Sequence, residues 1–368
     1  MERLYPNLIL DALRNVRYPA SGKNIVEAGM VADDIRIDGN RVSFSLIFDK
    51  PTDPFIKSLV RAAEAAITTY ISPEVDIKGN VGVITRQSMP VPAEKPLRNV
   101  KNIIGVSSGK GGVGKSTVAA NLAVALAREG YKVGLLDADI FGPSMPKMFG
   151  VEDEELYMHK VDDRDLIIPI ERYGVKLLSI GFLVDKNAPV LWRGSMASNA
   201  LKQLIGDADW GDLDYFVIDM PPGTSDIHLT LVQTLAITGV VIVTTPQEVA
   251  LADARKGIAM FTGDKVNVPI LGLVENMAWF TPETHPDEKY YIFGREGGVR
   301  LAKELGVKLL AQIPLVATVC ESGDGGEPIA RRDSLMGHEF IHLAHEVTEA
   351  VDRRNATLPP TQVVGLKK

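Results

Sequence analysis

A glycine-rich stretch that ends in lysine, serine and threonine has the residue types and the spacing for phosphate chemistry. Residues 109–117 read Gly-Lys-Gly-Gly-Val-Gly-Lys-Ser-Thr, between an apolar run at 103–106 and a helical pattern at 116–128. Glycines let backbone N–H groups turn toward phosphates, and the positive end of the following helix points to the same place. A chance glycine-rich turn would not be expected between a strand and a helix. The predicted nucleotide-binding residues are therefore Gly109, Lys110, Gly111, Gly112, Val113, Gly114, Lys115, Ser116 and Thr117.

Within this loop, two side chains have predicted contacts with ATP and its metal ion. We expect Lys115 to contact the β- and γ-phosphates of ATP and the Ser116 hydroxyl to ligate Mg²⁺.

Carboxylates at the ends of two further apolar runs favour hydrolysis over binding alone. Asp139, in Asp137-Ala-Asp139, is predicted to position the metal and the attacking water, and Asp219 to hold Mg²⁺ indirectly, through the ion's own ligands. Residues 220–223, Met-Pro-Pro-Gly, follow as a loop able to sense the γ-phosphate. An Asp at a strand end is often only a helix N-cap, but three such elements in this order favour an ATPase.

The elements that must position these residues repeat along the chain. Near-continuous apolar runs separated by helical patterns indicate a parallel sheet covered on both faces, and ligands of such sheets bind at the carboxyl ends of the strands. The predicted fold is α/β, a doubly wound, mostly parallel-sheet P-loop NTPase domain over residues 100–355. Its predicted strands include residues 103–106, 133–136, 175–180, 216–218, 240–243, 270–274 and 309–313.

A small α+β domain is predicted over residues 1–87. Helical patterns at 4–16 and 55–70 flank alternating runs at 35–37 and 42–48, which Asp38-Gly-Asn40 joins as a hairpin turn, and a last strand pair is expected at 75–84. A proline-rich linker at 88–99 and a flexible tail at 356–368 complete the predicted division.

Composition limits the function classes. The chain has 368 residues, 45% of them hydrophobic, and a net charge of −7, which disfavours a nucleic-acid binder because no basic field gathers phosphates. We see neither the apolar core of a signal peptide nor an apolar run long enough for a membrane span. The single cysteine excludes an internal disulfide framework and fits a reducing compartment. These features predict a cytoplasmic protein with no membrane partner.

The lysine inside the loop, Lys110, makes the sequence similar to a known group. Gly-Lys-Gly-Gly-Val-Gly-Lys-Ser-Thr resembles the deviant Walker A motif of the MinD, ParA and nitrogenase-iron-protein group, in which the extra lysine reaches across a dimer to the partner's nucleotide. Further segments look like the Mrp/ApbC branch, the ATP-hydrolysing iron–sulfur cluster carriers. They are Asp137-Ala-Asp-Ile-Phe-Gly-Pro-Ser-Met-Pro146, Leu191-Trp-Arg-Gly-Ser195, Asp219-Met-Pro-Pro-Gly-Thr-Ser-Asp226, Thr245-Pro-Gln-Glu-Val249 and Val274-Glu-Asn-Met277.

This resemblance runs from about residue 100 to about residue 330. It implies a homodimer with Lys110 acting in trans, adenine binding by Asn276, an iron–sulfur cluster as cargo and apoprotein clients. The N-terminal unit also resembles the iron–sulfur-assembly accessory domain often fused to Mrp proteins.

The sequence departs from the family pattern in its cysteines. Typical members carry C-x-x-C after Glu-Asn-Met, but residues 278–293 contain no cysteine, and neither do residues 51–54, where the accessory domain usually has one. Only Cys320 can supply a thiolate, and a lone cysteine is more often a small buried apolar residue. His285 with Glu283, Asp287 and Glu288 could offer harder ligands, although a solvated acidic loop explains them more simply.

Two other functions fit parts of the sequence. A MinD/ParA-like, nucleotide-switched partner-binding ATPase without a cluster is the main alternative; the acidic charge and the poor helix at Leu358-Pro-Pro-Thr disfavour its DNA or membrane surface. His338-Glu339-Phe-Ile-His342, extended by His345, matches the H-E-x-x-H motif of zinc proteases. It lies in a terminal amphipathic helix with few residues left for a catalytic domain, so we expect a packing helix.

Overall fold

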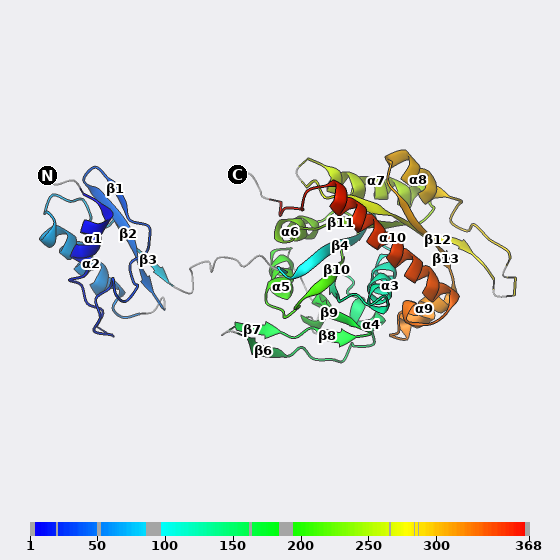
Figure 1. Cartoon of the computed structure of the whole chain (residues 1–368), viewed down its shortest axis with the longest axis horizontal. Coiled ribbons are helices and arrows are strands. Elements are labelled where there is room, and N and C mark those ends of the chain that lie inside the picture. Colours follow the sequence, from blue (N-terminus) through cyan, green and yellow to red (C-terminus); the bar gives the residue numbers. More distant parts are fainter. Residues whose placement is uncertain are drawn as a thin grey trace. The chain divides into compact units, whose positions relative to one another are not determined.

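The computed structural model describes residues 4–19, 21–49, 53–85, 97–161, 164–183, 194–264, 266–282, 284–285 and 287–364, with the backbone alone for residues 194 and 195. The chain divides into two compact units, Met1–Glu94 and Lys95–Lys368 (Figure 1). Among the described residues, no helix combines the length and the apolar character that a membrane crossing needs.

The first unit is a three-stranded sheet with two helices. Its elements are α1 (Pro6–Leu13), β1 (Arg36–Asp38), β2 (Arg41–Phe48), α2 (Ile56–Tyr70) and β3 (Val81–Thr85), and the sheet order is β1-β2-β3. β1 and β2 pair antiparallel through the predicted turn, where Gly39 has a φ of 59°. Alternate residues of β2 are buried among the apolar residues of both helices, so the predicted hairpin and the amphipathic helices are confirmed.

The strand pair predicted over residues 75–84 is wrong. Only β3 forms, parallel to β2, and the preceding segment contributes a single bridge between Arg41 and Asp76. Its backbone turns instead: Ile77 N donates to Val75 O and Asn80 N donates to Ile77 O. Gly79, with a φ of 80°, completes this turn.

The second unit is built on an eight-stranded sheet. Its order is β13-β12-β11-β4-β10-β5-β9-β8, and every pair is parallel except β8 with β9. The strands are β4 (Val100–Ser108), β5 (Val133–Asp137), β8 (Ile170–Arg172), β9 (Val175–Ser179), β10 (Leu213–Asp219), β11 (Gly239–Thr244), β12 (Ile270–Phe280) and β13 (Leu309–Leu315). All seven predicted apolar runs are strands, which confirms the mostly parallel α/β fold. The antiparallel edge strand β8 and a separate hairpin, β6 (Met158–Val161) with β7 (Arg164–Ile167), were not predicted.

Helices cover both faces of this sheet (Figure 1). One face buries its apolar residues against α3 (Lys115–Arg128), α4 (Met145–Met148) and α10 (Leu335–Thr357). The other packs on α5 (Gly194–Gly206), α6 (Asp226–Thr234), α7 (Glu248–Thr262) and α8 (Gly297–Leu305). Helix α9 (Ala317–Asp324) follows β13. This arrangement gives two apolar cores, one on each face, and leaves the strand ends as the place for ligands.

The predicted tail boundary at residues 355/356 lies inside a helix. α10 continues to Thr357, and the Arg354 guanidinium binds Pro359 O and Thr361 Oγ1 at 2.7 and 2.8 Å. Val364 N then donates to Val232 O. Residues 358–364 are therefore bound to the rest of the second unit and are not a loose tail. Of the predicted linker, residues 88–96 lie outside the described residues.

Candidate active site

The glycine-rich loop connects β4 to α3, and its glycines are needed for two different reasons. Gly112 and Gly114 have φ values of 80° and 81°, a left-handed conformation that side chains other than glycine rarely adopt. At Gly109 the reason is space, because an added Cβ would lie 2.1 Å from the backbone carbon of Asp253 in α7. The loop can therefore take this shape only with glycines at these positions.

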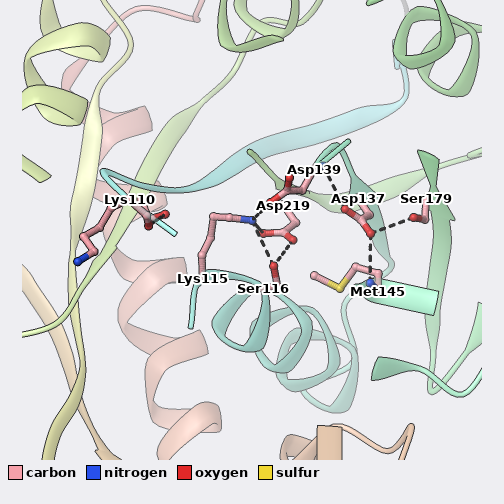
Figure 2. Close-up of polar contacts among 9 residues, drawn as sticks. Lys110, Lys115, Ser116, Asp137, Asp139, Met145, Ser179 and Asp219 are labelled. Carbon is pink, nitrogen blue, oxygen red and sulfur yellow. Dashed lines mark hydrogen bonds and ion pairs between the residues drawn. The ribbon is translucent and has the colours of Figure 1, made fainter. Parts of the chain in front are cut away.

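Lys115, Ser116 and Asp219 meet at the carboxyl end of the central strands (Figure 2). Lys115 Nζ lies 2.5 Å from Asp219 Oδ1 and 3.2 Å from Ser116 Oγ, and Ser116 Oγ donates to Asp219 Oδ2 at 2.7 Å. The side chains of Lys115 and Asp219 are only 6% and 0% exposed. The structure thus brings together a cation, a hydroxyl and a carboxylate that are 104 residues apart or less in the chain.

The register of the sheet explains this meeting. Asp219, the last residue of β10, stands opposite Val106 of β4 on one side and Asp137 of β5 on the other. Since parallel strands end at one edge, the loop after β4 and the two aspartates become neighbours. Burial raises the pKa of the Asp219 carboxyl, and the Lys115 ammonium opposes this rise.

Asp137 and Asp139 have different environments, although they are two residues apart. Asp139 Oδ2 lies 3.5 Å from Lys115 Nζ, so Asp139 lies in this cluster; its predicted role in positioning the attacking water stays a prediction. Asp137 instead accepts hydrogen bonds from Ser179 Oγ and from the backbone N–H groups of Met145 and Asp139 (Figure 2). Burial, and then the nearby Asp219 charge, raise its pKa to about 7. Asp137 fixes the loop that presents Asp139.

The loop after β10 is tied directly to the phosphate-loop strand. Met220 N donates to Val106 O at 3.0 Å, and Gly223 N donates to Ser108 O at 2.8 Å. Residues 220–223 therefore lie beside the loop that would carry the phosphates; their predicted sensing of the γ-phosphate stays a prediction.

Lys110 and Asn276 are placed differently from Lys115. Lys110 extends away from the Lys115 cluster (Figure 2), while its backbone carbonyl accepts a hydrogen bond from Ser108 Oγ. Asn276, 7% exposed, donates from Nδ2 to Val113 O at 2.8 Å, so its side chain holds the loop. Its predicted contact with adenine stays a prediction.

Glu275 is a buried residue that the sequence did not single out. Its Oε1 accepts from Gly298 N at 2.7 Å and its Oε2 from Gln312 Nε2 at 2.5 Å. These bonds tie β12 to α8 and β13, beside Asn276. In the sequence, Glu275 is only the first residue of Glu-Asn-Met. Its hydrogen-bond partners are 23 and 37 residues away, so the neighbouring sequence could not reveal them.

The oxygen donors fit Mg²⁺. Ser116 offers a hydroxyl, Asp219 and Asp139 offer carboxylates, and Mg²⁺ prefers hard oxygen ligands together with nucleotide phosphates. A carboxylate that is wholly buried, as in Asp219, needs a cation beside it. When bound, Mg²⁺ would neutralise phosphate charge at this point.

Comparison with known proteins agrees with this geometry. Residues 99–348 match the family model of the NUBPL iron-transfer P-loop NTPases, a ParA group. The chain belongs to this family. Residues 7–77 match a second family, the iron–sulfur cluster assembly proteins.

Individual relatives match most of the length of this chain. The chain is 44% identical over 351 residues to an iron–sulfur cluster carrier protein of Synechocystis, and this match covers 95% of this chain and 98% of the relative. A nucleotide-binding protein of Archaeoglobus fulgidus solved with ADP has a TM-score of 0.57 and 36% identity, over 67% of this chain and 94% of that one. MinD of Pyrococcus horikoshii with Mg-ADP has a TM-score of 0.50 and 25% identity, over 69% and 98%. The chain is thus a P-loop ATPase.

The interpretation of Cys320 as a small buried apolar residue is wrong. Cys320 is exposed on α9, where its Sγ lies 3.6 Å from Asp324 Oδ2. The Asp324 carboxylate raises the pKa of the thiol, which disfavours the thiolate that a cluster needs.

In residues 278–293, where the resemblance to Mrp/ApbC proteins implied C-x-x-C, two aromatic residues form a β-bridge. Phe280 and Tyr290 pair antiparallel, and Lys289 Nζ lies 3.8 Å from the centroid of the Trp279 ring. His285 Nδ1 contacts Thr284 Oγ1 at 3.0 Å. Glu283 lies outside the described residues, whereas Asp287 and Glu288 are exposed there. Over the described part of the chain, no group of three or more His, Cys, Asp or Glu residues is arranged to hold a metal ion.

Two of the three histidines at the H-E-x-x-H motif contact carboxylates of other segments. His338 Nε2 lies 2.7 Å from Asp333 Oδ1, and His345 Nε2 lies 3.0 Å from Glu129 Oε2. His342 is exposed on the same helix, α10, which packs on α3. These contacts support the predicted packing helix and give the zinc-protease alternative no support.

Proposed function

We propose that this protein hydrolyses ATP in order to carry iron–sulfur clusters and deliver them to apoproteins. The observation that carries the proposal is the buried convergence of Lys115, Ser116 and Asp219 at a glycine loop. It occurs in a chain 44% identical, over 95% of its length, to an iron–sulfur cluster carrier protein. Presence of a single cysteine fits a reducing compartment, and a cytoplasmic location is part of this proposal.

Each residue of the site has a proposed task. Lys115 binds the β- and γ-phosphates, which requires its ammonium to leave Asp219 when the nucleotide enters. Ser116 and Asp219 then face the metal, and Asp139 orients the attacking water. The buried site excludes bulk water from these charges, which strengthens their effect on the transferred phosphoryl group.

The cargo needs ligands beyond the thiolates of the chain itself. Cys320 is the only cysteine, so a homodimer supplies two thiolates, fewer than the four that [4Fe–4S] clusters commonly take. Histidine, carboxylate, an external thiol or a client cysteine must complete the set. Such mixed ligation favours a labile cluster, which suits transfer more than storage.

A homodimer is proposed from Lys110. Its side chain extends away from the Lys115 cluster of its own chain (Figure 2), so it is available to a nucleotide held by a second copy. A hydrolysis rate per chain that rises with protein concentration, and that loses this dependence in Lys110→Ala, would support the trans role.

The proposed function is tested by cluster transfer under anaerobic conditions. The protein is reconstituted with iron and sulfide, mixed with an apoprotein acceptor that takes a [4Fe–4S] cluster, and the acceptor's absorption is followed with and without ATP. We expect wild type to transfer and Lys115→Ala to lose the dependence on ATP. Wild-type ATPase activity without transfer to any acceptor would contradict the carrier proposal and favour a nucleotide-switched binding protein.

A further inference from the structure

Asn276 makes a contact that its predicted role at the adenine does not require. Its side chain, 7% exposed, donates from Nδ2 to Val113 O at 2.8 Å, and the two residues are 163 positions apart in the chain. A carbonyl oxygen can only accept a hydrogen bond, so the Asn276 atom that faces Val113 is the amide nitrogen. The bond therefore joins β12 to the phosphate loop through protein atoms alone.

The last glycine of the phosphate loop leaves space for this amide. A Cβ added at Gly114 would lie 2.1 Å from Asn276 Nδ2, far inside contact distance. Gly114 also has a φ of 81°, so a glycine is needed there for the backbone conformation as well as for the space. Asn276 thus lies directly against the peptide that joins Val113 to Gly114.

The geometry of that peptide gives the contact a consequence for phosphate binding. The peptide is trans, and in a planar trans peptide the C=O of one residue and the N–H of the next point in opposite directions. Because Asn276 holds the Val113 carbonyl on its own side, the Gly114 N–H is directed to the other side. Backbone N–H groups of such loops bind phosphate oxygens, so the Asn276 amide fixes the direction of one of these donors.

The end of β12 is built in a way that presents Asn276 at this point. Glu275, which is 0% exposed, accepts hydrogen bonds from Gly298 N and Gln312 Nε2, and successive side chains of a strand point to opposite faces. Directly after Asn276 the regular pairing with β13 is interrupted, and Met277 has a φ of 55°. A methionine rarely adopts this left-handed conformation, and backbone strain of this kind is typical of ligand sites.

We propose that Asn276 is a positioning residue of the phosphate loop, and that it directs the Gly114 N–H toward the triphosphate of ATP. Its effect on affinity does not depend on the base, because the bond is made between two parts of the protein. Loss of the side chain therefore weakens binding of the phosphates themselves. This inference rests on the ATP binding in the proposed function and is independent of cluster carriage.

Two ligands separate this role from a contact with adenine. ATP carries a base and a ribose, whereas inorganic tripolyphosphate has neither. Calorimetry in the presence of Mg²⁺ gives the Kd of both ligands for wild type, Asn276→Ala and Asn276→Leu, of which the leucine variant keeps a side chain of similar size without an N–H. Asn102→Ala is the matched control, because Asn102 Nδ2 also donates to a backbone carbonyl, that of Asp214 at 3.3 Å, near the amino end of β4.

We expect both Asn276 variants to bind ATP and tripolyphosphate about fivefold more weakly than wild type, as for loss of one hydrogen bond. Asn102→Ala should match wild type with either ligand. Weaker binding of ATP with unchanged binding of tripolyphosphate would overturn the proposal in favour of the adenine contact. Wild-type affinities in Asn276→Leu, or a wild type that binds ATP but not tripolyphosphate, would overturn it as well. A wild type that binds neither ligand would instead refute the proposed function, so the two failures are distinguishable.

Discussion

Removal of the ammonium from the Lys115–Asp219 pair is expected to destabilise the nucleotide-free ATPase unit strongly. The two atoms are 2.5 Å apart, and the side chains are 6% and 0% exposed, so Lys115→Met leaves a buried carboxylate without its cation. Loss of one partner of a buried pair costs about 3–5 kcal/mol. In a unit of this size that corresponds to a fall in melting temperature of roughly 10 °C.

A double-mutant cycle isolates the pair from the rest of the mutation. Lys115→Met with Asp219→Asn removes both charges of the pair, so we expect the double variant to regain at least about 2 kcal/mol relative to Lys115→Met. Lys101→Met is the matched control, because Lys101 and Asp214 also form a close pair, at 2.7 Å, but at the surface, with Lys101 74% exposed. Lys101→Met should lower the stability far less than Lys115→Met, because solvent screens an exposed pair.

Urea unfolding followed by tryptophan fluorescence gives these free energies for the ATPase unit alone. All three tryptophans, at positions 192, 210 and 279, lie in that unit, and Trp210 is buried in its core. Without Lys115, the pKa of the Asp219 carboxyl rises further, so the unfolded chain ionises first and the deficit of Lys115→Met should grow above about pH 4. A cost below about 1 kcal/mol, or additive effects in the double variant, would refute the reasoning.

Three further predictions concern Asp139, Lys110 and His228, a buried histidine of α6. Asp139→Ala should retain ATP binding, measured by calorimetry, while kcat falls about a hundredfold if its carboxylate orients the water; an unchanged kcat would exclude that role. Lys110→Ala should lower hydrolysis but leave the affinity of the monomer for ATP unchanged, and a rate independent of concentration down to a proven monomer would count against the trans lysine. Burial lowers the pKa of His228 from about 6.5 in the unfolded chain to about 4 in the folded protein. The unfolded state therefore binds the proton first as the pH falls, and the stability of the fold decreases between pH 6.5 and pH 4. Relative to His228→Gln, the free energy of unfolding of wild type, measured in urea, should fall by about 2 kcal/mol between pH 7.5 and pH 5. If the two proteins show the same dependence on pH, burial does not lower the pKa of His228 as described.

Strands buried on both faces were the predictable part of the fold. Their sequences are near-continuous apolar runs, and each run identified in this way is a strand. β6, β7 and β8 have three or four residues each, and most of their residues are exposed, so they carry no apolar run. Pairing with a neighbour, not hydrophobic pattern, makes them strands.

The site was predictable where the chemistry is local in sequence. The glycine loop with Lys115 and Ser116 is one continuous motif, and the strand ahead of Asp219 marked its position. The task of Asp137 was not predictable, because its partner Ser179 is 42 residues away. The exposure of Cys320 was missed for a related reason, since which side of a short helix faces solvent depends on what packs against it.

Iron and sulfide analysis after anaerobic reconstitution tests the central claim most directly, with ATP hydrolysis measured on the same samples. An ATPase that carries a cluster with one thiolate per chain should hold iron below stoichiometry, lose it on gel filtration, hold still less in Cys320→Ser, and hydrolyse ATP at the same rate with or without it. A stable, stoichiometric cluster that survives gel filtration in Cys320→Ser, and that ATP hydrolysis requires, would contradict the account.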